Sequence, residues 1–358
     1  MKPKIPNRLF ANSTTLSAIL VMSFAASSSA FAASATWNGT TDATWATDTN
    51  WSATPVPGTG DTATFDNAGS ANTTIDLGAG VTVGNINFST AAAAAYTLGS
   101  GAVGSQSLTL NAAGTITMGS LVANNQLINA NLNLGAVAGN QAFTLANLKT
   151  ATNTLTVAGA VSTAQTGVKT LTVDAAGLTN ISGIVSDGSG TVSLNKTGAS
   201  SLTLSGSNTY TGGTLITGIL NAASSSALGT GPVTVNTVAG NQLQLANGVN
   251  VNNALTINGG GIVAQGVVHV PTGSATFSGP ISITAAANAG AHFASVNDTS
   301  KLTIAGDNTI TASTPVTVRA GWVKITGDQN YTTGTTLGSA GTTIQFGKTT
   351  SMPATGAV

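Results

Sequence analysis

The sequence of 358 residues has no cysteine, no glutamate and few charged side chains of either sign. Without cysteine the chain can form neither disulfide bonds nor thiolate metal sites, so its fold must be held together by burial and backbone pairing. Charged residues make up 6% of the chain, with a formal net charge of zero. Because phosphates and anionic lipids are bound by clustered Lys and Arg, this composition argues against nucleic acid as a partner and provides no basic membrane-binding patch.

The residues that are abundant are those of strands and turns. Gly, Thr, Asn, Ser, Ala and Val dominate, whereas the helix formers Glu, Lys, Arg and Met are absent or scarce. A hydrophobic fraction of 41% argues against a highly charged disordered polymer. The composition therefore predicts an all-β fold, and repetition is the expected way for a long chain without disulfides to build it.

Residues 1–32 have the features of an export signal. Three basic residues among the first eight precede an apolar run over 16–26, and Ala30-Phe31-Ala32 supplies the small residues expected before a cleavage site. The apolar run is shorter than the ~20 residues that a membrane-spanning helix needs. We therefore predict that 1–32 is a signal peptide, cleaved after Ala32.

Residues 33–73 differ from the rest of the chain because they contain three of its four tryptophans, Trp37, Trp45 and Trp51. Two interpretations are open. The indole rings could stack on sugar faces, or they could cover the apolar end of a repeating stack, whose terminal unit needs atypical residues. Since such an end must be covered whatever the protein does, we favour an N-terminal cap over 33–73.

Short alternating strands recur over 74–358. In Leu155–Val157 and Leu171–Val173 the outer two residues share one face and the middle threonine takes the other, which indicates strands with one buried side. The repeat length can be estimated from two spacings along the chain. One is the spacing from Leu155 to Leu171, and the other, which is wider, separates the similar segments at Leu302 and Val323. They predict a parallel β-helix in which coils of about 16–21 residues each add one rung, giving about 16 coils.

A complete turn-and-strand unit occupies residues 194–236 and reads LNKTGASSLTLSGSNTYTGGTLITGILNAASSSALGTGPVTVN. It resembles the passenger-associated repeat of bacterial autotransporter proteins, whose signature is L-T-L-x-G-x-N-T-Y-x-G-G-T, then G-x-L, then S-x-A-L-G-x-G-x-V. The resemblance covers 202–214, 218–220 and 226–233. It implies an exported, right-handed parallel β-helix located at the cell surface or outer membrane, or outside the cell.

We interpret the signature residues as structural, because related residues recur in later copies. Asparagine tolerates a left-handed backbone conformation, and its side chains can form a hydrogen-bonded ladder between coils. Glycines such as Gly206, Gly213 and Gly334 are expected at corners with positive φ. The predicted signature residues are Leu202, Leu204, Gly206, Asn208, Tyr210, Gly212, Gly213, Gly218 and Leu220, with later counterparts at Gly306, Asn308, Gly327 and Tyr331.

No set of side chains predicts catalysis. A Ser-His-Asp arrangement around His292 would have to use Asp298 and Ser295, with no supporting motif. Without glutamate, glycoside hydrolysis would need paired aspartates, and Asp307 and Asp328 could be neighbours on adjacent coils. Such like-charged neighbours more often bind a cation or face water than act as a catalytic pair. We therefore predict no catalytic residue, no cofactor and no metal ligand.

The predicted function is that of a secreted or cell-surface structural and adhesive rod, the passenger-type region of an autotransporter-like protein. It would display Thr, Asn and Ser faces to extracellular glycans or to the surfaces of host or neighbouring cells. The resemblance also implies an outer-membrane barrel that this chain lacks, and 74–358 ends within a copy of the repeat, as expected for a chain truncated at its C-terminus. The competing class is a β-helical polysaccharide-active lyase or hydrolase, or a glycan-binding tailspike-like protein.

Overall fold

The computed structural model describes residues 33–150, 152–236, 240–259, 261–262, 265–284, 292–305, 311–312, 315–328, 334–338 and 341–347. All of them belong to one compact unit, residues 32–358. Among the described residues the regular structure is β, apart from two short 3-10 turns, η1 (Asp48–Asn50) and η2 (Gly69–Ala71). None of the helices in this described part is long and apolar enough to cross a membrane.

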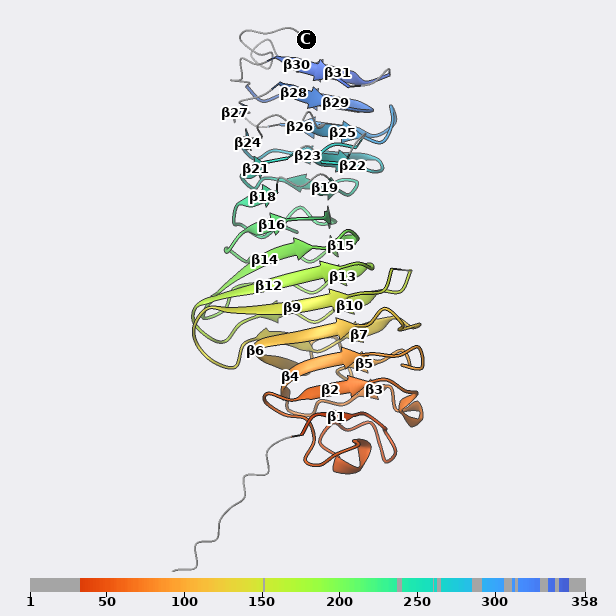
Figure 1. The fold of residues 1–358 in the computed structure, drawn as a ribbon. Helices are drawn as coiled ribbons and strands as arrows, with labels where there is room; N and C mark the ends of the chain where they lie inside the picture. Colours follow the sequence, from red (N-terminus) through yellow and green to blue (C-terminus); the bar gives the residue numbers. More distant parts are fainter. Residues whose placement is uncertain are drawn as a thin grey trace, which may run out of the picture. The chain divides into compact units, whose positions relative to one another are not determined.

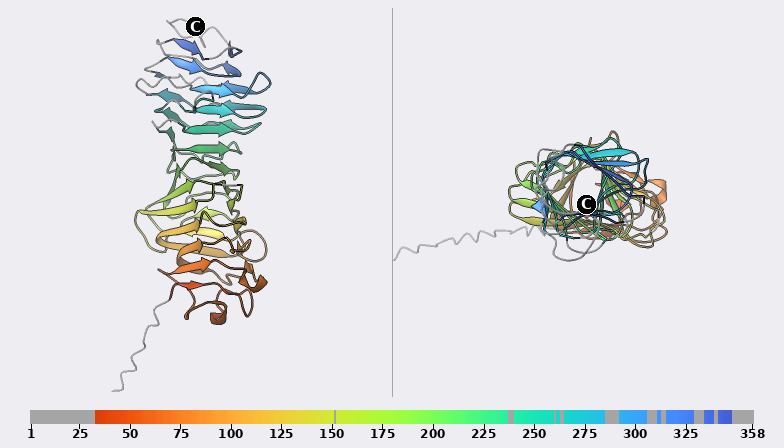
Figure 2. Two further views of the ribbon diagram at one scale, coloured as in Figure 1. Left: turned by 45° about the vertical axis from the view of Figure 1, so that its right-hand side comes forward. Right: turned by 90° about the horizontal axis from the view of Figure 1, so that it is seen from above.

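The strands of this unit pair in parallel and stack as a solenoid of about 12 turns (Figure 1). Seen along the stack, they surround a common axis (Figure 2). The predicted all-β fold, a parallel β-helix, is confirmed. We call the 14-stranded, 12-stranded and 5-stranded sheets sheet 1, sheet 2 and sheet 3.

Each sheet collects strands from successive coils. Sheet 1 contains β1 (Ala35–Thr36), β2 (Thr62–Phe65), β4 (Val81–Phe88), β6 (Ser107–Met118), β8 (Asn131–Leu134), β9 (Gln141–Asn147), β11 (Val161–Ser162), β12 (Val168–Ala175), β14 (Thr191–Thr197), β16 (Thr214–Ile216), β18 (Val233–Val235), β21 (Leu255–Ile257), β24 (Ile281–Ile283) and β27 (Thr311–Ala312). Sheet 2 contains β3 (Thr74–Ile75), β5 (Thr97–Leu98), β7 (Gln126–Ile128), β10 (Leu155–Val157), β13 (Thr179–Ile181), β15 (Ser201–Leu204), β17 (Ile219–Ala222), β19 (Gln242–Leu245), β22 (Val268–Val270), β25 (Phe293–Ser295), β28 (Val316–Val318) and β30 (Thr335–Leu337). Sheet 3 contains β20 (Asn250–Val251), β23 (Ser274–Phe277), β26 (Lys301–Ile304), β29 (Trp322–Ile325) and β31 (Thr343–Phe346).

The coils are on the whole longer than predicted, which is why there are about 12 turns rather than about 16. Coil length also varies, because the register pairs Ser201 with the nearby Ile219 but Thr97 with the much later Leu127. The spacing from Leu155 to Leu171 was misread, since these strands lie in sheet 2 and sheet 1 and are not successive rungs of one sheet. The spacing from Leu302 to Val323 was read correctly, since these two residues pair in register.

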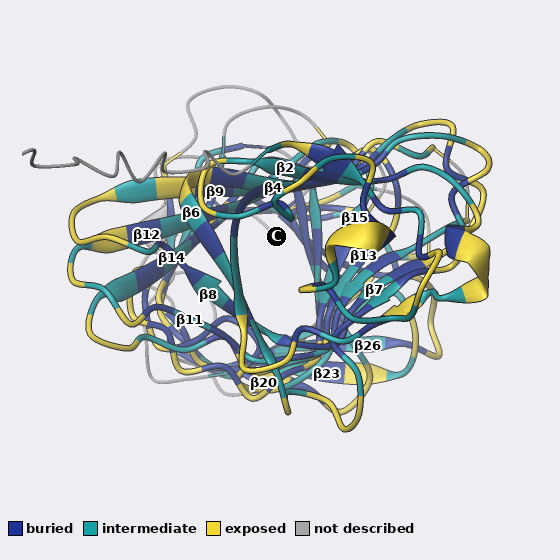
Figure 3. Ribbon diagram, turned by 90° about the horizontal axis from the view of Figure 1, so that it is seen from below, coloured by how far each residue is buried: buried dark blue, intermediate teal, exposed yellow. Residues whose placement is uncertain are grey.

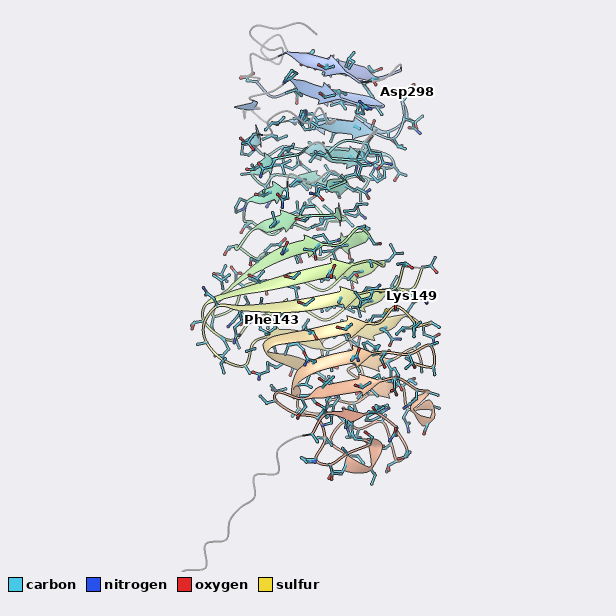
Figure 4. The ribbon with its side chains drawn as sticks, viewed as in Figure 1. Phe143, Lys149 and Asp298 are labelled. Atoms are coloured by element: carbon cyan, nitrogen blue, oxygen red, sulfur yellow. The ribbon has the colours of Figure 1, made fainter. Side chains whose placement is uncertain are left out.

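The core lies inside the stack, where alternate residues of every strand meet. In β15 the burial alternates residue by residue, with Leu202 and Leu204 fully buried. Figure 3 shows the buried positions on the strands and the exposed ones concentrated in the connecting loops. Figure 4 shows Phe143 within sheet 1 and Lys149 and Asp298 on peripheral loops, and of these three only Phe143 is buried. Apolar burial of this kind, accumulated coil by coil, stabilises the stack.

An aromatic cluster covers the first coil. The ring centroids of Trp37 and Trp51 are 5.1 Å apart and those of Trp45 and Trp51 are 4.7 Å apart, both in edge-on geometry, and Phe65 packs against all three indoles. Each indole N–H donates to a backbone carbonyl, for example that of Trp45 to Pro57 at 3.1 Å. All three tryptophans are buried, so their rings offer no face on which a sugar could stack, and this favours the cap interpretation.

Candidate functional site in the repeat segment

The apolar signature residues lie in the core of adjacent coils. Leu202 of β15 pairs in register with Leu220 of β17, which in turn pairs with Leu243 of β19. All three side chains are fully buried. The leucines of the signature therefore form rungs of the inner wall of sheet 2, a position from which they can contact no ligand.

Asn208 connects three coils through its side-chain amide. Its Oδ1 accepts the backbone N–H of Val185 in the preceding coil at 2.8 Å, and its Nδ2 donates to the carbonyl of Ala227 in the following coil at 2.6 Å. The residue is 1% exposed. Because both ends of the amide are used on buried backbone groups, Asn208 serves the stacking of the repeat.

Tyr210 is also held inside the stack. Its hydroxyl lies 2.6 Å from Oγ1 of Thr214, which occupies an inward position of β16, so each satisfies the other in a buried setting. Burial raises the pKa of the Tyr210 phenol above its ordinary value. The phenol is thus a buried neutral group that a ligand cannot reach.

The signature glycines are required mainly by the close approach of neighbouring coils. A Cβ on Gly206 would lie 2.4 Å from the carbonyl oxygen of Gly183, although Gly206 is not one of the glycines with positive φ, so that expectation was wrong. Gly213 and Gly334 do have positive φ, at 81° and 85°. The counterparts Gly306, Asn308 and Tyr331 lie outside the described residues, as does Asp307.

The copies of the repeat do not occupy equivalent faces of the solenoid. The Leu202 strand, β15, belongs to sheet 2, whereas the Leu302 and Val323 strands, β26 and β29, belong to sheet 3. Sheet 3 begins at β20. In earlier coils the strands that directly follow those of sheet 2, such as β8 and β11, pair with each other and with β6 and therefore belong to sheet 1. Sequence analysis missed this shift, since the motif describes local corners and strands and not their position around the axis.

Outward positions of sheet 1 form a column that runs through ten successive coils. Its members are paired in register, and all but one are polar. The exception is Leu215, which is 38% exposed. The column consists of Thr62, Asn85, Thr115, Thr144, Thr172, Asn195, Leu215, Thr234, Thr256 and Ser282.

A pocket of about 380 Å³ opens on this outer face beside Leu215. A second outward column runs alongside the first, from Thr170 to Ser193, which are paired in register. In the next two coils this column continues with Gly213 and Pro232. These two residues directly precede Thr214 and Val233, which pair with each other in register. Since Gly213 has no side chain, the second column is interrupted there, and we call the resulting hollow the glycine pocket.

The residues that line the glycine pocket carry no charge. Hydroxyl groups are provided by Thr170, Ser193 and Thr234, and an amide by Asn195. Oγ1 of Thr170 lies 3.0 Å from Oγ of Ser193. The Oδ1 of Asn195 is buried and has no hydrogen-bond partner among the described residues, so an acceptor in the pocket lining is unsatisfied.

The edge of sheet 1 is protected where the sheet narrows beside the pocket. Strand β14 has seven residues, but β16 pairs with it only from Leu194 to Lys196. The carboxylate of Asp187 accepts the backbone N–H groups of Val192 and Thr211 and the hydroxyl of Thr211. The sequence around Asp187 does not contain the G-G-x-G-x-D nonapeptides that bind calcium in β-rolls. The Asp187 carboxylate instead accepts hydrogen bonds from the open edge of a strand.

Two lysines lie inside the stack. Nζ of Lys169 donates to the carbonyls of Val137 and Gly139 and to Oε1 of Gln141. Nζ of Lys196 donates to the carbonyls of Thr197 and Gly198. Burial lowers the pKa of Lys196 to about 8. Both ammonium groups are held by neutral oxygens of corners, where they satisfy backbone acceptors.

The histidines do not form a catalytic arrangement with the residues weighed for one. His292 is buried and its Nδ1 accepts the backbone N–H of Thr317 at 3.0 Å, whereas Asp298 is exposed on a peripheral loop (Figure 4). The hydroxyl of Ser295 donates to the carbonyl of Ser300 at 2.7 Å and accepts the backbone N–H of Trp322. Burial lowers the pKa of His292 to about 4. No group of His, Cys, Asp or Glu suited to a metal ion occurs among the described residues.

These features define a repeat-built parallel β-solenoid in which Leu202, Asn208 and Tyr210 of the signature are buried and the outward column on sheet 1 is mainly polar. The model of the passenger-associated-transport-repeat family matches residues 194–218, which run from β14 to the corner after β16. The chain therefore carries this repeat, and the predicted resemblance is confirmed. No curated protein and no solved structure matches the chain significantly.

Proposed function

We propose that the chain is the passenger-type region of an autotransporter-like protein, exported to the cell surface, where it acts as a non-enzymatic adhesive rod. The repeat and the parallel β-solenoid fit an autotransporter passenger domain. The observation that carries the proposal is the match over 194–218, a segment whose Asn208 and Tyr210 are used to stack coils. A family of exported proteins implies that such coils are displayed outside the cell.

The adhesive part of the proposal is supported by the outer face of sheet 1. From Thr62 to Ser282 every coil except that of Leu215 contributes one hydroxyl or amide group to this face, with a spacing of about 4.8 Å between neighbouring strands. A regular row of neutral donors and acceptors suits contact with neutral polymers such as glycans, because it can hydrogen-bond along the polymer without requiring a charged partner.

The location can be tested on intact source cells. An antibody against residues 33–347 should label the surface of intact cells, and added protease should remove the label. The matched control is the chain without 1–32, which should stay inside the cell if this segment is the export signal. Wild-type protein that remains inside, protected from protease, would contradict the proposal.

Adhesion and catalysis can be separated with the purified chain. Beads coated with the chain should bind cells or immobilised neutral polysaccharide, and the supernatant should contain no newly released reducing ends. Saccharide release that is lost in Asp328→Ala would instead support the polysaccharide-active alternative.

A further inference from the structure

We propose that the glycine pocket on sheet 1 is a binding site for a neutral saccharide. The inference rests on the proposed adhesive function and assigns it to one place on the solenoid. The pocket lies over the repeat match, because Gly213 and Leu215 both fall within 194–218. The glycine pair of the signature therefore shapes the outer surface as well as the corner.

The first argument is the interruption of two otherwise regular columns at the same place. Leu215 is the one apolar member of a polar column of ten, and Gly213 removes the side chain from the neighbouring column. The result is a hollow with an apolar wall at Leu215 and Pro232 and hydroxyl or amide groups around it. A sugar ring has the complementary character, with an apolar C–H face and hydroxyl groups at its rim.

The second argument is the state of Asn195. Its Oδ1 is buried and accepts no hydrogen bond from the described residues, although it lies in the pocket lining. The terminal torsion of an asparagine side chain is broad, so a small rotation can turn this acceptor towards a ligand hydroxyl. A bound hydroxyl would then satisfy a group that the protein alone leaves without a partner.

The third argument concerns the class of ligand. No lining residue is charged, so the pocket offers no ion-pair partner to a uronic acid, a phosphate or an amine. Its volume of about 380 Å³ is at the lower end of the range for small-molecule sites. The site therefore suits one or two neutral sugar units, and many such contacts along a surface would add through multivalency.

The test is saturation-transfer NMR on the full chain with methyl α-glucoside, methyl α-mannoside and methyl β-galactoside as probes, and with methyl glucuronide as the charged comparison. We expect at least one neutral probe to receive saturation and the glucuronide to receive little. The variant Ser193→Trp, which fills the hollow above Gly213, should lower the affinity by roughly tenfold or more. The matched control Thr203→Trp, at an outward position of β15 in sheet 2, should bind like wild type.

A second variant keeps the test valid if Ser193→Trp does not fold. Leu215→Ser removes the apolar wall without adding bulk at an exposed position, and it should also weaken binding. Binding that survives in both variants, an equal loss in Thr203→Trp, or no saturation of any neutral probe would overturn the inference. If the pocket variants still support adhesion of intact cells, the proposed function stands and the assignment of this site alone fails.

Discussion

The carboxylate of Asp187 accepts the backbone N–H of Val192 at 2.7 Å, where sheet 1 changes from long strands to short ones. Val192 lies in the part of β14 that β16 does not cover, and its carbonyl accepts the N–H of Gly212 at 3.0 Å. At this exposed edge of β14, the side chain of Asp187 therefore pairs with the N–H of Val192, and the backbone of Gly212 pairs with its carbonyl. Edges that are left open are sites of pairing with other chains.

Replacing Asp187 should therefore lower stability and promote association. Asp187→Ala leaves the N–H of Val192 without its acceptor, and we expect a loss of about 1–3 kcal/mol in the free energy of unfolding. Denaturant titration followed by circular dichroism measures the loss, and light scattering measures association. Asp48→Ala is the control, because Asp48 is exposed in η1 and should change neither quantity.

Removal of the Asn208 amide should be more costly than removal of another asparagine of the same repeat. Asn208→Ala leaves the N–H of Val185 and the carbonyl of Ala227 unsatisfied, for an expected loss of about 2–4 kcal/mol. Asn221→Ala should have little effect, since the Oδ1 of Asn221 already has no partner among the described residues. Equal losses in the two variants would show that Asn208 does not connect the coils in the way its contacts indicate.

The stability of the fold should rise on the alkaline side because of Lys196. Its folded-state pKa is about 8, below the ordinary value of 10.5, so the unfolded chain binds this proton more tightly. The free energy of unfolding should therefore increase as the pH rises from about 8 to 10.5 and lose this contribution as the pH falls through 8. Lys196→Met, measured over the same range, should show a flatter profile. A decrease with rising pH that is the same in both proteins would contradict the assignment.

On the acid side the buried histidines should destabilise the fold. Burial lowers the pKa values of His269 and His292 to about 4, from 6.5, so the folded state keeps them neutral. Their contribution is complete above pH 6.5 and is lost as the pH falls towards 4, where the unfolded chain is already protonated. The double variant His269→Phe with His292→Asn should lose less stability between pH 6.5 and 4 than wild type. Parallel profiles would exclude the histidines as the cause.

Much of the fold could be predicted from the sequence because strand alternation is local. Leu202 and Leu204 are separated by one polar residue, and that pattern alone fixes which side of β15 is buried. The pairing of Leu302 with Val323 was also predictable, since the two segments resemble each other residue by residue. The passenger-type repeat at 194–218 was recognised for the same reason, as its signature is a continuous string.

The features that were missed depend on what lies between strands. The variation in coil length was predicted, but the coils are longer than predicted because the corners and loops add residues that a strand motif does not record. Lys196 could have been recognised as inward from its spacing with Val192 and Leu194 in β14, but a lysine is rarely expected inside. The glycine pocket needs the register of β12, β14, β16 and β18, which no single segment contains.

The N-terminal coil has a consequence for assembly. Thr36 of β1 directs its N–H to Oγ of Ser52 and accepts the N–H of Ser52 at its carbonyl, both at 2.9 Å, on the side away from β2. At the same end, Trp37 and Trp51 form an isolated antiparallel β-bridge, and their rings pack edge-on. A second solenoid that approached this edge of β1 would find the N–H and carbonyl of Thr36 already paired with Ser52. Rods of this protein should therefore not join at their N-terminal ends into fibrils, however many are crowded on one surface.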